Sequence, residues 1–163
     1  METITIFTDG STLNNQNKLK RRGGYGVYFG DDDSRNISES LGKTGKHTNQ
    51  VAELTACVKG IEKILESDDK VNIIIYTDSN YTVQSMTNWG KKWEKNNWIN
   101  SKGKVIENKE LIITLFNYTK KYKIKFKHVR AHQKEPSKDS PDHFYWYGNY
   151  MADKLANLGV SKI

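Results

Sequence analysis

Two short apolar segments that end alike place the strongest constraint on how this chain can fold. Residues 3–8 and 71–76 are rich in β-branched side chains, as is typical of buried strands. Between them, residues 51–65 carry apolar side chains at alternating spacings of three and four, which predicts an amphipathic helix. A helix that crosses between two neighbouring strands makes those strands parallel. The two strands should therefore share one C-terminal edge.

The other segments repeat the same two patterns and complete a mixed sheet. The strand pattern recurs at 23–30, 36–41 and 123–129. The helix pattern recurs around 81–86, 111–122 and 149–158. We therefore predict an α/β fold whose five-stranded mixed sheet has three antiparallel strands, then two parallel ones, with helices on both faces. Alternating lysines on the last strand are typical of a protected sheet edge.

Length and composition narrow the class of protein. The 163 residues contain no internal repeat and no low-complexity linker, so we expect a single domain over residues 1–163. Cys57 is the only cysteine, the start of the chain lacks a signal pattern, and no apolar run could span a bilayer. We expect an intracellular protein, in cytoplasm or nucleus, that does not contact membranes. The net charge of +7 favours a polyanionic partner, although solubility alone would also explain it.

Carboxylates mark the predicted C-terminal edge of the sheet. The segments Phe-Thr-Asp-Gly-Ser and Tyr-Thr-Asp-Ser place Asp9 and Asp78 at turn signals after the two parallel strands. Glu53 and Asp153 lie beside apolar positions of two predicted helices. Oxygen ligands without a cysteine or histidine cluster suit magnesium or manganese rather than zinc. The alternative interpretation is that these acids are turn caps and solvated helix residues.

Five segments, in order along the chain, resemble the ribonuclease H family, in its type-one branch and the catalytic domain of the eukaryotic enzyme. The resemblance runs from about residue 3 to 158 through segments 7–11, 48–53, 76–79, 128–132 and 148–153. It implies a ribonuclease H-like fold and an endonuclease that hydrolyses the RNA strand of RNA–DNA hybrids, leaving 3′-hydroxyl and 5′-phosphate ends. It also implies two Mg²⁺ ions, with Mn²⁺ as a substitute.

The same resemblance assigns the catalytic residues. Asp9, Glu53, Asp78 and Asp153 match the four metal-binding carboxylates of the family. His132 matches a loop histidine that assists proton transfer or product departure, whereas a lone loop histidine is otherwise more often an ordinary surface residue. His143 is an alternative proton-handling group, although His132 is favoured because it follows the last strand directly.

Residues 89–98 combine three of the four tryptophans with lysines. Trp89 and Trp93 are one helical turn apart and could either pack in the core or contact nucleic acid. The segment resembles the family's basic protrusion, which implies that Trp89, Trp93 and Ser101 contact the DNA strand.

The resemblance also implies contacts at the start of the first long helix. Lys46, Thr48 and Asn108 match a pocket for a DNA phosphate, with Lys46 in place of the expected arginine. Asn15, Asn49 and Gln50 match residues that approach the RNA strand, where a 2′-hydroxyl is sensed. Gly10 and Ser11, beside Asp9, are also expected to contact the substrate. Turn and helix-cap roles are the alternative for Asn15, Asn49 and Gln50.

The chain departs from the family pattern in two ways. We expect no separate hybrid-binding module before the catalytic domain, and we expect a monomer without an obligate protein partner. The segment 133–147 is longer than the family's short turn and holds both prolines and an aromatic run. We expect its proline-rich half to be mobile and its aromatic half to pack against the domain.

Three other functions compete with this interpretation. The first is a binding module that has lost catalysis, which the presence of all four carboxylates opposes. The second is a polynucleotidyl transferase such as an integrase, which the tryptophan–lysine segment disfavours. The third is a small-ligand domain of flavodoxin type, but the chain has no glycine loop that could cradle a phosphate.

Overall fold

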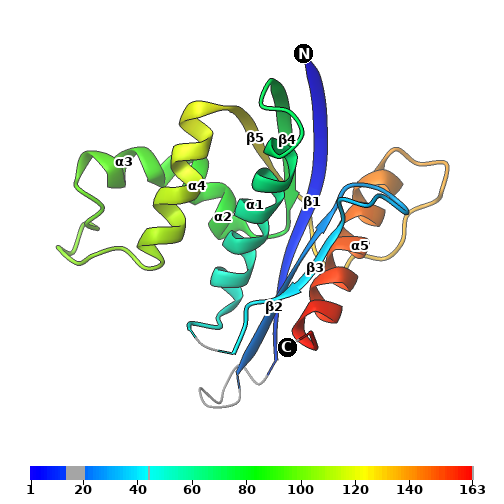
Figure 1. Cartoon of the computed structure of the whole chain (residues 1–163), viewed down its shortest axis with the longest axis horizontal. Coiled ribbons are helices and arrows are strands. Elements are labelled where there is room, and N and C mark those ends of the chain that lie inside the picture. The colour runs from blue at the N-terminus through cyan, green and yellow to red at the C-terminus, as the bar shows by residue number, and fades with distance from the viewer. Residues whose placement is uncertain (14–20, 44, 163) are drawn as a thin grey trace.

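A five-stranded mixed sheet forms the centre of the computed structural model, which describes residues 1–13, 21–43 and 45–162 (Figure 1). The strands are β1 (Glu2–Leu13), β2 (Arg22–Tyr28), β3 (Ile37–Ser40), β4 (Val71–Thr77) and β5 (Lys123–His128). Their order across the sheet is β3-β2-β1-β4-β5. β1, β2 and β3 pair antiparallel, whereas β1, β4 and β5 pair parallel. The predicted fold class is confirmed, and the lysine-bearing β5 is an edge strand.

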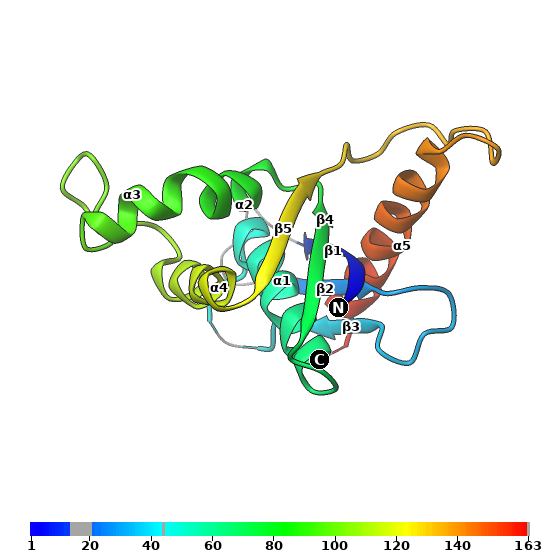
Figure 2. The ribbon, with the colours of Figure 1, turned by 90° about the horizontal axis from the view of Figure 1, so that it is seen from above.

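Helices cover both faces of the sheet. They are α1 (Asn49–Leu65), α2 (Asn80–Gln84), the π-helix η1 (Ser85–Trp89), α3 (Gly90–Lys95), α4 (Lys109–Lys121) and α5 (Asp142–Val160). Figure 2 shows α1 and α4 on one side of the sheet, α5 on the other, and α3 projecting away from the body. None of the helices within the described ranges is both long enough and apolar enough to cross a bilayer.

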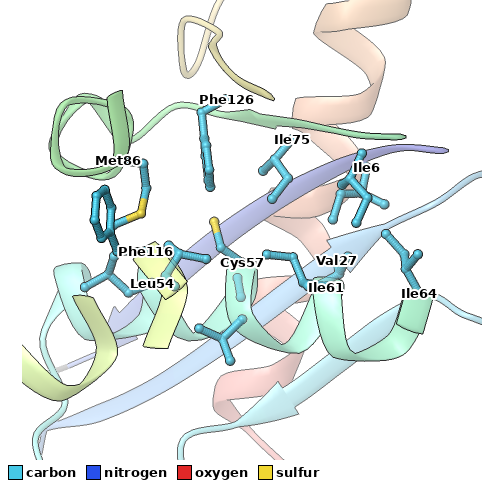
Figure 3. Packing of buried hydrophobic residues seen from close by; sticks show 14 of the residues in the cluster. Ile6, Val27, Leu54, Cys57, Ile61, Ile64, Ile75, Met86, Phe116 and Phe126 are labelled. Atoms are coloured by element: carbon cyan, nitrogen blue, oxygen red, sulfur yellow. The ribbon is translucent and has the colours of Figure 1, made fainter. Parts of the chain in front are cut away.

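The main core lies between α1 and the sheet. Ile6, Val27 and Ile75 project from the strands toward Leu54 and Ile61 of α1, and all five are fully buried (Figure 3). Cys57 is buried among them as an apolar filler, as its helical context predicts. A second, smaller cluster under α5 contains aromatic residues of β1, β2 and β4. The sheet is therefore anchored from both faces.

The expectation that β1 stops at Asp9-Gly10-Ser11 is wrong. Parallel pairing with β4 ends at Thr8, but antiparallel pairing with β2 continues to Leu13. Gly10 is not a turn residue, because it pairs with Tyr25 of β2. A Cβ at Gly10 would lie 2.5 Å from the Glu53 backbone nitrogen. The glycine instead allows α1 to approach β1 closely. Asp9 therefore projects from a continuous strand at the point where its parallel neighbour ends.

The last helix begins earlier than its sequence pattern indicates. It starts at Asp142 rather than near residue 149, so the aromatic run lies on α5 and not in a loop. Aromatic residues are only moderate helix formers, and packing against the sheet outweighs that preference. Phe144 lies edge-on to Phe7, with ring centroids 5.5 Å apart. The aromatic half thus contacts the sheet as expected, but Phe144 and Tyr145 remain 56% and 40% exposed. The mobility of the proline-rich half stays a prediction.

Gly10→Ala should destabilise the protein. The new methyl group would meet backbone atoms of Ala52 and Glu53, which cannot move away by changing rotamer. Overpacking of this kind costs about 1–3 kcal/mol of unfolding free energy, measurable by urea denaturation. Gly30→Ala is the matched control, because a Cβ there meets no atom within 4 Å. Equal stability of the two variants would show that the close approach of α1 to β1 is not constrained by Gly10.

Candidate metal centre and active site

Three carboxylates from three elements converge at the C-terminal edge of the parallel strands. Asp9 lies on β1 where its pairing with β4 ends, and Asp78 follows the last residue of β4. Glu53 comes from α1, which the close contact at Gly10 holds against β1. One oxygen from each of the three carboxylates lies within 4.8 Å of the others. The structure thus brings together three of the four predicted ligands in a group that could hold a metal ion.

Burial makes this cluster electrostatically unfavourable in the absence of a cation. Asp9 is 4% exposed and Glu53 is 8% exposed. Desolvation, followed by the charge of Glu53, raises the pKa of Asp9 far above its ordinary value. Desolvation likewise raises the pKa of Glu53. Oε2 of Glu53 is buried without a hydrogen-bond partner in the described part of the chain. An oxygen left without a partner among acids matches the donor set of a hard divalent cation.

Asp153 approaches the same site from α5. It lines a cavity of about 490 Å³ together with the other three carboxylates. Its charge is the second largest contribution, after desolvation, to the raised pKa of Asp78. It does not belong to the tight group of three among the described residues. The fourth predicted ligand therefore faces the site at the periphery of the cluster.

A polar chain that the sequence did not reveal orients Asp153. The Ser11 hydroxyl donates to Oδ1 of Asn157 over 2.5 Å, and Nδ2 of Asn157 donates to Oδ2 of Asp153 over 3.3 Å. Asn157 lies one helical turn after Asp153, so the spacing of four residues was the available signal. Ser11, predicted to contact substrate, thus also holds Asn157 and lines the cavity beside Asp9.

His132 lies at this site and His143 does not. His132 lines the carboxylate cavity from the loop after β5, and its backbone adopts a left-handed conformation with φ of 53°. Its ring lowers the pKa of Asp78, opposing the larger effects of burial and Asp153. His143 instead lies 2.8 Å from Oε2 of Glu135. The structure therefore places the favoured histidine, rather than the alternative, next to the carboxylates.

The N-terminus of α1 gathers several predicted substrate-binding residues. Thr48 caps the helix through its hydroxyl, which accepts from the Val51 amide. Asn49 and Gln50 line the carboxylate cavity, and Asn49 also accepts a hydrogen bond from Thr12. The Thr48 and Asn49 side chains thus combine structural contacts with positions beside the site.

The proposed phosphate pocket lies next to this helix end. Asn108 donates to Gln50 over 3.3 Å, and Lys46 forms a 2.8 Å ion pair with Glu107. Both partners of that ion pair are well exposed, so the contact contributes little to stability and an anion can compete for Lys46. Asn15, the remaining predicted contact, lies outside the described residues.

Two tryptophans of the basic segment, Trp89 and Trp93, pack on one another, whereas Trp98 packs on Phe116 of the core. Trp89 lies in η1 and Trp93 in α3, with ring centroids 5.7 Å apart. Trp93 also packs against the main core, so the core interpretation holds for part of its ring. Lys91 and Lys92 are exposed on the same short helix, and Ser101 is exposed in the turn that follows. The segment therefore combines an aromatic pair that packs against the core through Trp93 with exposed lysine side chains.

Comparison with known proteins agrees with this geometry. The RNase H family model matches residues 1–161. The human protein Ribonuclease H1 is 34% identical over 98% of this chain and 50% of its own length. Ribonuclease HI of Haemophilus ducreyi is 32% identical over 99% of this chain and 92% of its own length. The chain spans about half the length of the mammalian relatives that it matches.

Solved structures share the fold. A foamy viral protease–reverse transcriptase in complex with RNA/DNA hybrid superposes with a TM-score of 0.76 and 22% identity, over 98% of this chain and 20% of that one. LC9-RNase H1, described as a type 1 RNase H with the type 2 active-site motif, gives a TM-score of 0.73 and 22% identity, over 98% and 72%. The fold expected from the sequence is thus the fold of these proteins, and with the match over residues 1–161 this chain belongs to the RNase H family.

Proposed function

We propose that this chain is an endonuclease that hydrolyses the RNA strand of RNA–DNA hybrids and leaves 3′-hydroxyl and 5′-phosphate ends. The observation that carries the proposal is the group of three carboxylates within 4.8 Å, one of them with a buried oxygen that lacks a partner. Membership of the RNase H family supplies the class of reaction. A domain of this size that keeps both the acids and the basic aromatic segment fits an enzyme better than an inactive binding module.

The donor set fits Mg²⁺, with Mn²⁺ as a substitute, because every ligand is a carboxylate oxygen. Asp9 and Asp78 would bind or bridge the ions, Glu53 would hold the ion nearer the RNA, and Asp153 the other. Two divalent ions about 3.5–4 Å apart activate a water and stabilise the leaving oxygen in phosphodiester hydrolysis. The Asn157 amide holds the Asp153 carboxylate toward this site.

Other residues would handle protons and substrate. His132 lies beside Asp78, where an exposed imidazole can accept or donate a proton near the leaving group. Asn49 and Gln50, which line the same cavity, would approach the RNA strand. The DNA strand would lie against Trp89, Trp93 and the residues around the N-terminus of α1. Positive charge on the exposed lysines would neutralise its phosphates.

Asp9→Asn and Asp78→Asn should each abolish cleavage while leaving hybrid binding intact. Each change removes a ligand charge and keeps the shape of the side chain, so several kcal/mol of transition-state stabilisation, or about a 100-fold or greater loss in kcat, should follow. The measurement is cleavage of a labelled hybrid in magnesium, with binding followed by anisotropy. Asp69→Asn, at an exposed acid in the turn before β4, is the control. Near-normal turnover by either active-site variant would refute the ligand assignment.

Without metal, the stability of the protein should fall as the pH rises. The folded-state pKa values of Asp9 and Glu53 lie above their ordinary values because of burial. The folded state therefore holds protons that the unfolded state releases above about pH 4, and unfolding free energy declines until the folded pKa values are passed. Thermal unfolding in chelator from acidic to alkaline pH should show this decline. Asp9→Asn should flatten it, and magnesium should stabilise the wild type more at alkaline than at acidic pH. If the thermal stability of the wild type in chelator does not change with pH, the explanation by buried acids is wrong.

Removing charge from α3 should change how salt affects binding. Lys91→Ala and Lys92→Ala should each reduce the slope of log affinity against log salt by about 1 if the lysine contacts a phosphate. Lys70→Ala is the control and should leave the slope unchanged, because Lys70 precedes β4 at the end of that strand away from Asp78. If both α3 variants keep the slope of the wild type, α3 is not part of the binding surface.

A further inference from the structure

A second cavity lies behind the loop that carries His132. It has a volume of about 540 Å³ and is lined by Tyr76, Lys127, His128, Val129, Arg130, Gln133, Lys134, Pro136, Asp142, Tyr145 and Trp146. Within the loop, Ala131 and His132 line the carboxylate cavity, whereas Arg130 and Gln133 on either side line this one. A single thickness of chain therefore separates the two cavities. His128 adds a direct link, because its Nε2 lies 3.2 Å from the backbone oxygen of Asp78.

The cavity exists because α5 leaves part of the sheet uncovered. The helix packs mainly against β1, β2 and β3, and diverges from β5 (Figure 2). Tyr76 of β4 and Lys127 of β5 are partners in register, so both side chains project from the face that α5 covers only in part, and the Tyr76 ring, 9% exposed, forms the floor beneath Lys127. The first turns of α5 then form the opposite wall with Tyr145 and Trp146.

The charge around the cavity is positive. Lys127, Arg130 and Lys134 line it, against the single carboxylate of Asp142. In the part of the chain that the structure describes, Arg130 and Lys134 have neither an ion-pair nor a hydrogen-bond partner for their side chains. Such cations close together repel one another and favour an anion between them.

The aromatic walls are held in place by their own contacts. Tyr145 is 40% exposed, and its ring centroid lies 5.2 Å from that of Tyr76. Nε1 of Trp146 donates to the backbone oxygen of Gln133 over 2.8 Å, which ties the indole to the loop. Exposed, preorganised rings beside cations are the combination that binds single-stranded nucleic acid, in which bases stack and phosphates are neutralised.

We propose that this cavity binds an unpaired nucleotide of a single-stranded extension that adjoins the hybrid. The base stacks on Tyr145, and the phosphate lies between Arg130 and Lys134. A paired nucleotide does not suit the site, because its base faces are covered by its neighbours in the duplex. The inference rests on the proposed function, since the hybrid at the carboxylates delivers the extension to the adjacent cavity.

The test compares a blunt hybrid with hybrids of equal duplex length that carry a five-nucleotide extension. The four arms place the extension on the RNA or the DNA strand, at the 5′ or the 3′ end. Binding is measured by anisotropy in chelator, and cleavage of the blunt hybrid is measured in magnesium. At least one extension should tighten wild-type binding by about five- to tenfold, the lower part of the range for one stacked base. The responding arm identifies the strand that reaches the cavity.

Variants then test whether the gain in affinity for the extended hybrid over the blunt hybrid depends on the cavity. Tyr145→Leu and the double variant Arg130→Gln/Lys134→Gln should lose it, and both should still cleave the blunt hybrid like the wild type. The matched controls are Tyr122→Leu, a tyrosine beside α4 that lines a different cavity, and Lys138→Gln, an exposed lysine of the same loop. Both should keep the gain.

The proposal is overturned if no extension improves wild-type binding, or if the improvement survives in the Tyr145 and double variants. Loss of the gain in the controls as well would equally overturn it, because the effect would not be specific to the cavity. Failure of the wild type to cleave the blunt hybrid would instead count against the proposed function, and the binding comparison would be judged separately.

Discussion

Three acidic side chains from β1, α1 and the end of β4 are held within 4.8 Å of one another, largely out of water, and much of the structure serves to hold them there. Like charges at this spacing repel strongly in a medium of low dielectric constant. The cluster persists because it stands on rigid elements, namely two parallel strands and a helix packed on a large apolar core. A cation relieves the repulsion, so the energetic cost of the metal-free site is also the source of its affinity for metal.

Close packing of the helices at glycine residues sets the geometry of this cluster. Gly10 lets α1 lie directly against β1, which brings Glu53 beside Asp9. On the other face, Gly148 lets α5 pass over the ring of Phe7, where a Cβ would lie 2.3 Å from the ring. α5 in turn carries Asp153, and the chain from Ser11 through Asn157 aligns that carboxylate with β1. The packing of the core therefore sets the geometry of the site. Substitutions at small residues of the core should change the positions of the carboxylates.

The segment after β5 connects the site to its surroundings. One side of it presents His132 to the carboxylates, and the other side presents cations to the cavity beside α5. The early start of α5 shortens the irregular part of this connection and places the aromatic run on a helix. Positive and aromatic side chains therefore gather at two places, the cavity beside α5 and the tryptophan–lysine segment around α3.

The sequence alone determined the order of the five strands and the three long helices, because buried strands and amphipathic helices have distinct apolar periods. It did not indicate η1 or α3. Parallel pairing of β1 with β4 followed from the intervening helix, and that pairing is enough to predict that Asp9 lies near Asp78. The positions of Glu53 and His132 followed from family resemblance rather than from spacing. The end of β1 and the start of α5 could not be predicted from the sequence. The length of a strand depends on its partner strand, and whether aromatic residues of moderate helix propensity form a helix depends on what they pack against. Only the tertiary structure revealed the role of Gly10, the alignment of Asp153 by Asn157 and the second cavity. Each of these depends on contacts between segments far apart in the sequence, and the local pattern of side chains carries no record of such contacts.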